Sequence, residues 1–143
     1  MECEFPTVNS NKDEIKAIFD KCKTIAVLGL SPDPEKPSHY VSKYLQEQGF
    51  KIVPIYPKGD EILGEKVYRS LEEIPFTVDM VDIFRKANAL PAIAKVALDR
   101  GDVKVFWSQK GIVNNEAAQL VQQAGLDVVQ NKCAMVEHKA LKG

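Results

Sequence analysis

The chain contains 143 residues, of which 45% are hydrophobic and 27% are charged. Because domains usually contain about 100–200 residues, this length predicts a single domain over residues 1–143, with an N-terminal tail of about residues 1–10. The 19 basic and 20 acidic side chains give a formal net charge of −1, which excludes a generally basic nucleic-acid-binding protein.

Neither a membrane span nor a secretion signal is evident in the sequence. The longest apolar run, residues 25–30, is far shorter than the roughly 20 residues of a membrane helix. The N-terminus is polar and acidic and has no apolar signal core. The three cysteines lie far apart and form no CxxC pair, which is typical of a reducing compartment. We therefore expect a cytoplasmic protein that binds neither membranes nor nucleic acid.

Apolar, β-branched segments predict five strands, at residues 24–30, 51–56, 78–84, 103–107 and 126–130. Apolar residues with helical spacing predict four helices. In chain order, the apolar faces of these helices are Ile15, Ile18, Phe19 and Cys22; then Val41, Tyr44 and Leu45; then Leu90, Ile93, Ala94, Ala97 and Leu98; and last Ala117, Leu120, Val121 and Ala124. Asn11 and Glu14 have capping-box spacing at the first helix. Later helices are expected to end at Gly49, Gly101 and Gly125.

Strands that alternate with helices predict parallel β-α-β units. The expected fold is α/β: a three-layer, Rossmann-like, doubly wound parallel sheet of five strands in the order 3-2-1-4-5, numbered along the chain. The connection between residues 56 and 78 is less regular, although Ser70 and Glu73 can cap one helical turn there. Ligands of such sheets bind beyond the carboxyl ends of the strands, where the strand order reverses.

The segment after the first predicted strand combines a glycine with a helix start. Gly29 allows the backbone to approach a ligand closely, and Pro37 suits a first helical turn. Ser38 can cap that helix or hydrogen bond to a phosphate, and free N–H groups at a helix start attract anions. The alternative is a proline-stiffened loop with an ordinary cap, but its position favours a phosphate contact.

The end of the second strand argues against a dinucleotide cofactor. The chain has no GxGxxG motif, and residues 55–58 read Ile-Tyr-Pro-Lys where a ribose-binding acid is expected. Lys58 favours a phosphate instead, although it is equally well explained as a solvated surface lysine. An NAD-binding regulator is therefore a less favoured hypothesis.

Two further strand ends carry aromatic side chains. Phe84 and Arg85 can stack on a base and pair with a phosphate, or can serve as a core residue and a cap. Trp107 can form a ligand shelf, although core packing is the commoner role for tryptophan. The predicted rim carries a local group of cations, which suggests a polyanionic small ligand: Lys36, Lys58, Arg85, Lys86 and Lys110.

No catalytic motif is evident. Cys133 and His138 near the C-terminus are a possible nucleophile pair or metal ligands, but a packed thiol and a surface histidine are favoured. Asp79 and Asp82 lie three positions apart in a strand and are expected to point to opposite faces, so they form no acid–base pair.

The sequence resembles the small bacterial and archaeal CoA-binding proteins, whose domain is similar to the CoA-binding domain of the succinyl-CoA synthetase α subunit. The resemblance covers about residues 12–141 and rests on the order and spacing of several segments. These segments are TIAVLGLSPDPEKPSHYVSKYLQEQGFKIVPIYP, ILGEKVYRSLEEIP, VDMVDIFRKA, WSQKGI and NKCAMVEH.

The resemblance implies that coenzyme A binds across the strand ends. It assigns cofactor-binding roles to Gly29, Leu30, Ser31, Lys36, Pro37, Ser38, Pro54, Tyr56, Lys58, Phe84, Arg85 and Trp107. The chain departs from the family at Tyr56, where asparagine is frequent, and at His39-Tyr40, where an aromatic residue and then a basic residue are frequent.

The favoured hypothesis is a non-catalytic module that binds, carries or senses CoA or an acyl-CoA, with no metal. One alternative is a thiol-redox protein in which Cys133 forms a mixed disulfide with CoA. Another is an interaction or scaffold subunit that docks on an unknown protein partner or forms a homodimer.

Overall fold

The computed structural model describes residues 11–142, so the predicted tail lies outside the described residues. The parallel strands are β1 (Thr24–Leu28), β2 (Lys51–Ile55), β5 (Met80–Ile83), β6 (Val105–Ser108) and β7 (Asp127–Val129). The helices are α1 (Lys12–Lys21), α2 (Pro37–Glu47), α3 (Leu90–Arg100), α4 (Asn115–Gln123) and α5 (Ala134–Lys142). Shorter elements are the hairpin β3 (Glu61–Ile62) and β4 (Glu65–Lys66), and the 3₁₀ turns η1 (Leu71–Glu73) and η2 (Ala87–Ala89).

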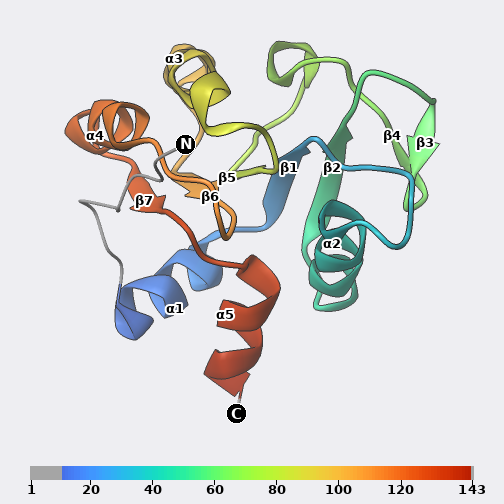
Figure 1. Ribbon diagram of the computed structural model, residues 1–143, viewed down its shortest axis with the longest axis horizontal. Coiled ribbons are helices and arrows are strands. Elements are labelled where there is room, and N and C mark those ends of the chain that lie inside the picture. The colour runs from blue at the N-terminus through green and yellow to red at the C-terminus, as the bar shows by residue number, and fades with distance from the viewer. Residues whose placement is uncertain (1–10, 143) are drawn as a thin grey trace.

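Helices cover both faces of the sheet, which confirms the predicted three-layer α/β architecture (Figure 1). One face packs against α1, α2 and α5, with Phe19, Leu45 and Trp107 in its core. The other face packs against α3, α4 and η1 around Phe106 and Leu90. No helix in the described range 11–142 is long and apolar enough to cross a membrane.

Local signals in the sequence correspond closely to the observed helix ends. Asn11 and Glu14 form the predicted capping box at α1. The turn predicted at Ser70 forms η1, but the Ser70 hydroxyl hydrogen bonds to the Glu73 carboxylate rather than capping the backbone. Helix α5 was not predicted, because Ala134 is its only buried residue in the described chain and the segment shows little apolar periodicity.

The predicted strand order is wrong in one respect. The observed order is β2-β1-β5-β6-β7, which is 2-1-3-4-5 for the five strands counted along the chain. The outer edge of β2, where the prediction placed residues 78–84, is occupied by Tyr68. The Tyr68 N–H donates to the Pro54 carbonyl at 2.9 Å, and the Tyr56 N–H donates to the Tyr68 carbonyl at 3.0 Å. Strand β5 therefore pairs with the opposite edge of β1, and the order reverses between β1 and β5.

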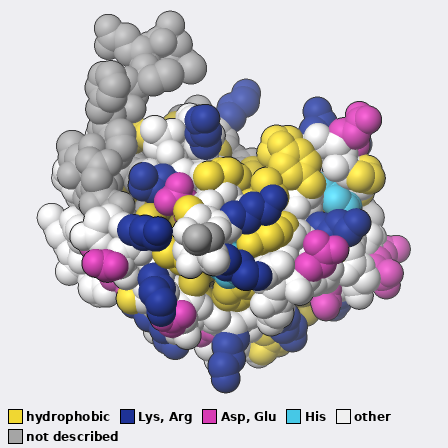
Figure 2. All heavy atoms as spheres, turned by 90° about the horizontal axis from the view of Figure 1, so that it is seen from below, with side chains coloured by type: hydrophobic (Ala, Val, Ile, Leu, Met, Phe, Trp, Pro, Cys, Tyr) yellow, Lys and Arg dark blue, Asp and Glu magenta, His cyan; other side chains and the backbone are white. Residues whose placement is uncertain are grey.

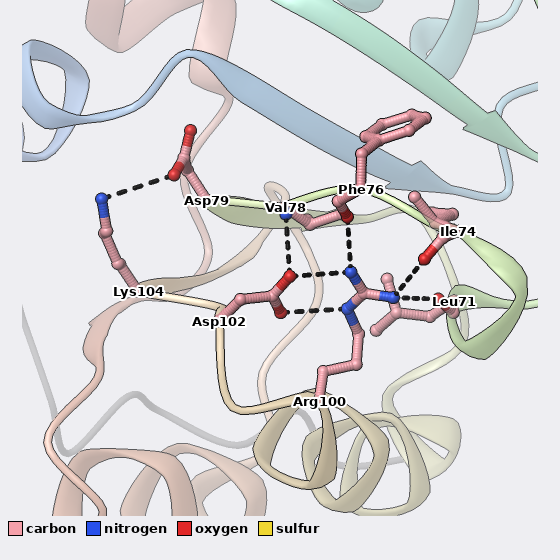
Figure 3. Close-up of polar contacts among 8 residues, drawn as sticks. All are labelled: Leu71, Ile74, Phe76, Val78, Asp79, Arg100, Asp102 and Lys104. Atoms are coloured by element: carbon pink, nitrogen blue, oxygen red, sulfur yellow. Dashed lines mark hydrogen bonds and ion pairs between the residues drawn. The ribbon is translucent and has the colours of Figure 1, made fainter.

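A polar cluster fixes the connection that leads into β5 (Figure 3). Arg100, the last residue of α3, forms a bidentate pair with Asp102 at 3.0 and 2.8 Å. Its guanidinium also donates to the carbonyl oxygens of Leu71, Ile74 and Phe76 at 2.8–2.9 Å. Desolvation of Asp102 opposes its ionisation, but hydrogen bonds from Arg100 and the Val78 N–H outweigh it and lower the pKa of Asp102.

Candidate functional site

The strand order reverses at a close contact between two loops. Gly29, directly after β1, has φ +87°, and its N–H donates to the Ile55 carbonyl at 2.9 Å. A Cβ atom at this position would lie 2.7 Å from the Phe84 carbonyl oxygen, which follows β5. Only glycine fits this position without strain, because both the backbone angle and the backbone contact exclude a side chain. The ends of β1, β2 and β5 therefore converge at Gly29.

An open groove of about 360 Å³ lies at this convergence. It is lined by seven residues, all of which the sequence analysis assigned to the site: Gly29, Ser31, Lys36, Pro37, Ser38, Tyr56 and Phe84. The lining contains a hydroxyl pair, one cation and two aromatic rings, and it contains no carboxylate, imidazole or thiol. This composition is suited to holding a phosphorylated, aromatic ligand.

Side chains of α2 hold the loop after β1 in place. The Ser31 N–H donates to the Ser38 hydroxyl oxygen at 3.0 Å, and His39 Nδ1 donates to the Ser31 carbonyl at 2.8 Å. Ser38 is only 5% exposed yet lines the groove. Because the Ser38 oxygen accepts the bond from Ser31, its own O–H proton remains available to donate to a ligand.

The N-terminus of α2 is open to an anion. Its N-cap residue, Lys36, forms no side-chain capping bond, and the first turn contains no acidic residue. By contrast, Asn11 caps α1 and Asn114 caps α4. Pro37 has no N–H, and the His39 N–H already donates to the Lys36 carbonyl at 2.9 Å. The Ser38 N–H and the helix dipole are therefore what favour a negatively charged ligand here.

Exposed cations border the same strand ends. Lys58 and Arg85 do not line the groove, but the Arg85 side chain lies next to Gly29. Across residues 11–142, no carboxylate lies within ion-pair distance of Lys36, Lys58 or Arg85. Figure 2 shows Lys and Arg side chains beside hydrophobic surface on the α1–α5 side as well. Positive charge alone therefore does not distinguish the groove from the rest of the surface. The distinguishing feature of the groove is the combination of unpaired cations with an uncapped helix start.

Three predicted site residues are buried and do not reach the groove surface. Leu30 and Trp107 are completely buried, and Pro54 is buried within β2. The indole N–H of Trp107 donates to the Lys132 carbonyl at 2.8 Å, and its ring packs 5.3 Å from that of Phe19. Trp107 is therefore a core residue, the role favoured for it over ligand contact, and β5 separates its strand from β1; the binding role implied by the resemblance finds no support in this position.

A buried polar pair beneath the strand ends was not predicted as part of the site. Asp82 in β5 is completely buried and accepts a hydrogen bond from the Gln109 amide, while its Oδ2 atom has no partner. The Gln109 carbonyl oxygen accepts the N–H of Ala134, the first residue of α5, at 3.2 Å. Burial raises the pKa of Asp82 to about 7, against the opposing bond from Gln109. The sequence feature that could have revealed this pair is the acidic residue Asp82 within an otherwise apolar strand.

The C-terminal thiol lies directly before α5, and the imidazole lies within it. His138 is half-buried among aromatic rings and hydrogen bonds through Nδ1 to the Tyr44 hydroxyl at 2.7 Å. Burial, with a smaller effect of Lys142, lowers the pKa of His138. Cys133 is a free, partly exposed cysteine. No group of three or more metal-ligating side chains is found in the part of the chain that the structure describes.

The parallel sheet, its reversal at β1 and β5, and a groove at that point define a Rossmann-like α/β domain. The chain belongs to the CoA binding domain family, whose model matches residues 23–139. This match confirms the family resemblance noted in the sequence.

Individual relatives agree with this assignment. The uncharacterized protein YneT of Bacillus subtilis (strain 168) is 43% identical over 134 residues, which cover 94% of this chain and 98% of YneT. The structure of a hypothetical protein from Pyrococcus horikoshii OT3 matches with a TM-score of 0.90 and 38% identity over 100% of both chains. The alpha subunit of acetate–CoA ligase (ADP-forming) I from Pyrococcus furiosus is 34% identical over 117 residues, which are 76% of this chain but 25% of that subunit.

Proposed function

We propose that this protein binds coenzyme A or an acyl-CoA in the groove between Gly29, Ser38 and Tyr56, and that it acts as a non-catalytic binding, carrier or sensing module in the cytoplasm. The observation that carries the proposal is the uncapped start of α2 beside unpaired cations in a groove at the strand reversal. The family match and the named ligase relatives support CoA as the ligand.

The groove offers a separate contact for each part of this ligand. The Ser38 hydroxyl and the start of α2 are suited to the diphosphate. The rings of Tyr56 and Phe84 are suited to packing against adenine. The lack of an acid, imidazole or thiol among the lining residues supports a binding role rather than a catalytic one.

Removing two of the cations tests the placement of the phosphates. We expect the Lys58→Ala/Arg85→Ala double variant to bind CoA about 10–100-fold more weakly, because each of these exposed cations should contribute about 0.7–1.4 kcal/mol, less than a fully desolvated charged hydrogen bond. The loss for dephospho-CoA, which lacks the 3′-phosphate, should be smaller. Isothermal titration calorimetry measures both affinities.

The matched control is Lys12→Ala/Lys95→Ala, which removes the same charge from exposed positions on α1 and α3. This control should leave the CoA affinity within about twofold, because neither side chain lines the groove and salt screens exposed charges that do not contact the ligand. An unchanged CoA affinity in the Lys58→Ala/Arg85→Ala variant would show that the phosphates bind elsewhere.

A further inference from the structure

Arg69 is hydrogen-bonded to the backbone of Tyr56, a residue that lines the groove, and was not among the predicted site residues. Its Nη1 atom donates to the Tyr56 carbonyl oxygen at 3.0 Å, and the ring of the same Tyr56 lines the groove. The guanidinium is therefore held at the carboxyl end of β2, where the chain turns toward Lys58. Arg69 itself is exposed.

Backbone pairing fixes Arg69 in this position. The preceding residue, Tyr68, forms a parallel bridge with Ile55 and hydrogen bonds to both Pro54 and Tyr56 at 2.9–3.0 Å. Residues 66–68 thus lie along the outer edge of β2, and Arg69 is the first residue beyond this pairing. A side chain that emerges from paired backbone is better positioned than one in a free loop, so less conformational entropy is lost when it binds a ligand.

The guanidinium has unused capacity for an anion. A guanidinium carries five N–H donors, and the Tyr56 carbonyl accepts a bond from one nitrogen. Asp60 and Glu61 belong to the same connection, yet neither forms an ion pair with Arg69 or Lys58 in the described structure. Two unpaired cations near one strand end suit a doubly charged phosphate monoester, which accepts the forked hydrogen bonds of arginine.

We propose that Arg69, together with Lys58, forms a phosphate-monoester subsite at the end of β2 that recognises the 3′-phosphate of CoA. This inference rests on the proposed function and adds a specificity-determining residue to it. The subsite is distinct from the start of α2, which belongs to the loop after β1 and is suited to the diphosphate. Arg69 therefore distinguishes CoA from dephospho-CoA, whereas the start of α2 binds both.

The test compares CoA and dephospho-CoA binding to Arg69→Gln. Glutamine removes the charge, but its amide nitrogen ends two bonds short of the Arg69 Nη1 position, so the melting temperature is compared as well to separate support of the backbone from recognition of phosphate. We expect CoA affinity to fall about tenfold or more, in line with the loss of a charge-assisted hydrogen bond, and dephospho-CoA affinity to stay within about twofold. Arg69→Lys should lose less affinity, since it keeps the charge but not the fork.

Lys66→Gln is the matched control, because it removes one charge from the same edge while Lys66 packs over the Tyr68 ring. It should leave the ratio of the two affinities unchanged. If Arg69→Gln, with an unchanged melting temperature, leaves that ratio unchanged or weakens both ligands equally, Arg69 only supports the backbone and the inference is wrong. If the unmodified protein binds neither ligand, the proposed function itself fails, which is a different result.

Discussion

Replacing Arg100 with alanine is expected to lower the free energy of unfolding by about 3 kcal/mol, because it leaves a mostly buried carboxylate and several carbonyl groups without their donor. The Arg100 side chain is 12% exposed and that of Asp102 is 26% exposed, so solvent replaces the lost bonds poorly. The three carbonyl oxygens that accept hydrogen bonds from Arg100 lie in the connection that leads into β5 (Figure 3). Urea unfolding followed by circular dichroism measures the change.

Two control variants separate this cluster from an ordinary ion pair. Arg100→Lys keeps the charge but loses the bidentate geometry, so its loss should be intermediate. Lys16→Ala removes an exposed i,i+4 pair with Asp20, in which both side chains are 64% exposed, and should cost less than about 1 kcal/mol. An Arg100→Ala loss as small as that of Lys16→Ala would contradict the role assigned to the cluster.

Asp82→Asn is expected to stabilise the protein at pH 8. Burial raises the pKa of Asp82 from 3.8 to about 7, so between these values the native state holds a proton that the unfolded chain has released. The stability contributed by the protonated carboxyl is therefore lost as pH rises from about 4 to 7, and it stays lost above 7. At 1.36 kcal/mol for each pKa unit, the gain for the neutral asparagine at pH 8 is at most about 4 kcal/mol.

Urea unfolding at pH 5 and pH 8 tests whether Asp82→Asn raises or lowers the free energy of unfolding. The advantage of Asp82→Asn over the unmodified protein should be larger at pH 8. Asp79 provides the opposite case: desolvation opposes its ionisation, but bonds from the Thr24 and Lys23 N–H groups and from Lys104 outweigh it and lower its pKa. Asp79→Asn should therefore destabilise the protein at pH 8. Destabilisation by Asp82→Asn at pH 8 would show that the ionised carboxylate is favoured in the fold.

Much of the site was predictable because its determinants are local. The Gly29 turn, the proline helix start at Pro37 and the aromatic residue after each of two strands are recognisable from neighbouring residues. All seven residues that line the groove were among the predicted site residues, several of them, such as Ser31 and Tyr56, only through the family resemblance. The capping box at Asn11 is equally local.

What the sequence did not predict depends on contacts between distant segments. Periodicity predicts which segments form strands but not which strands pair with one another. Because Tyr68 pairs with the outer edge of β2, β5 pairs with the free edge of β1 instead. Trp107 was assigned to the site through its place at a strand end and the family resemblance, whereas the structure buries it against Phe19. Arg69 was overlooked because only the pairing of Tyr68 with the edge of β2 brings it to the Tyr56 carbonyl.

Isothermal titration of the unmodified protein with CoA, with dephospho-CoA and NAD alongside, tests the central claim most directly. The protein must first be shown to be folded and free of ligand carried over from purification. We predict a CoA dissociation constant in the micromolar range, weaker binding of dephospho-CoA, and little or no binding of NAD. No measurable binding of CoA by the folded, ligand-free protein would contradict the proposed function and would favour a scaffold role for this domain.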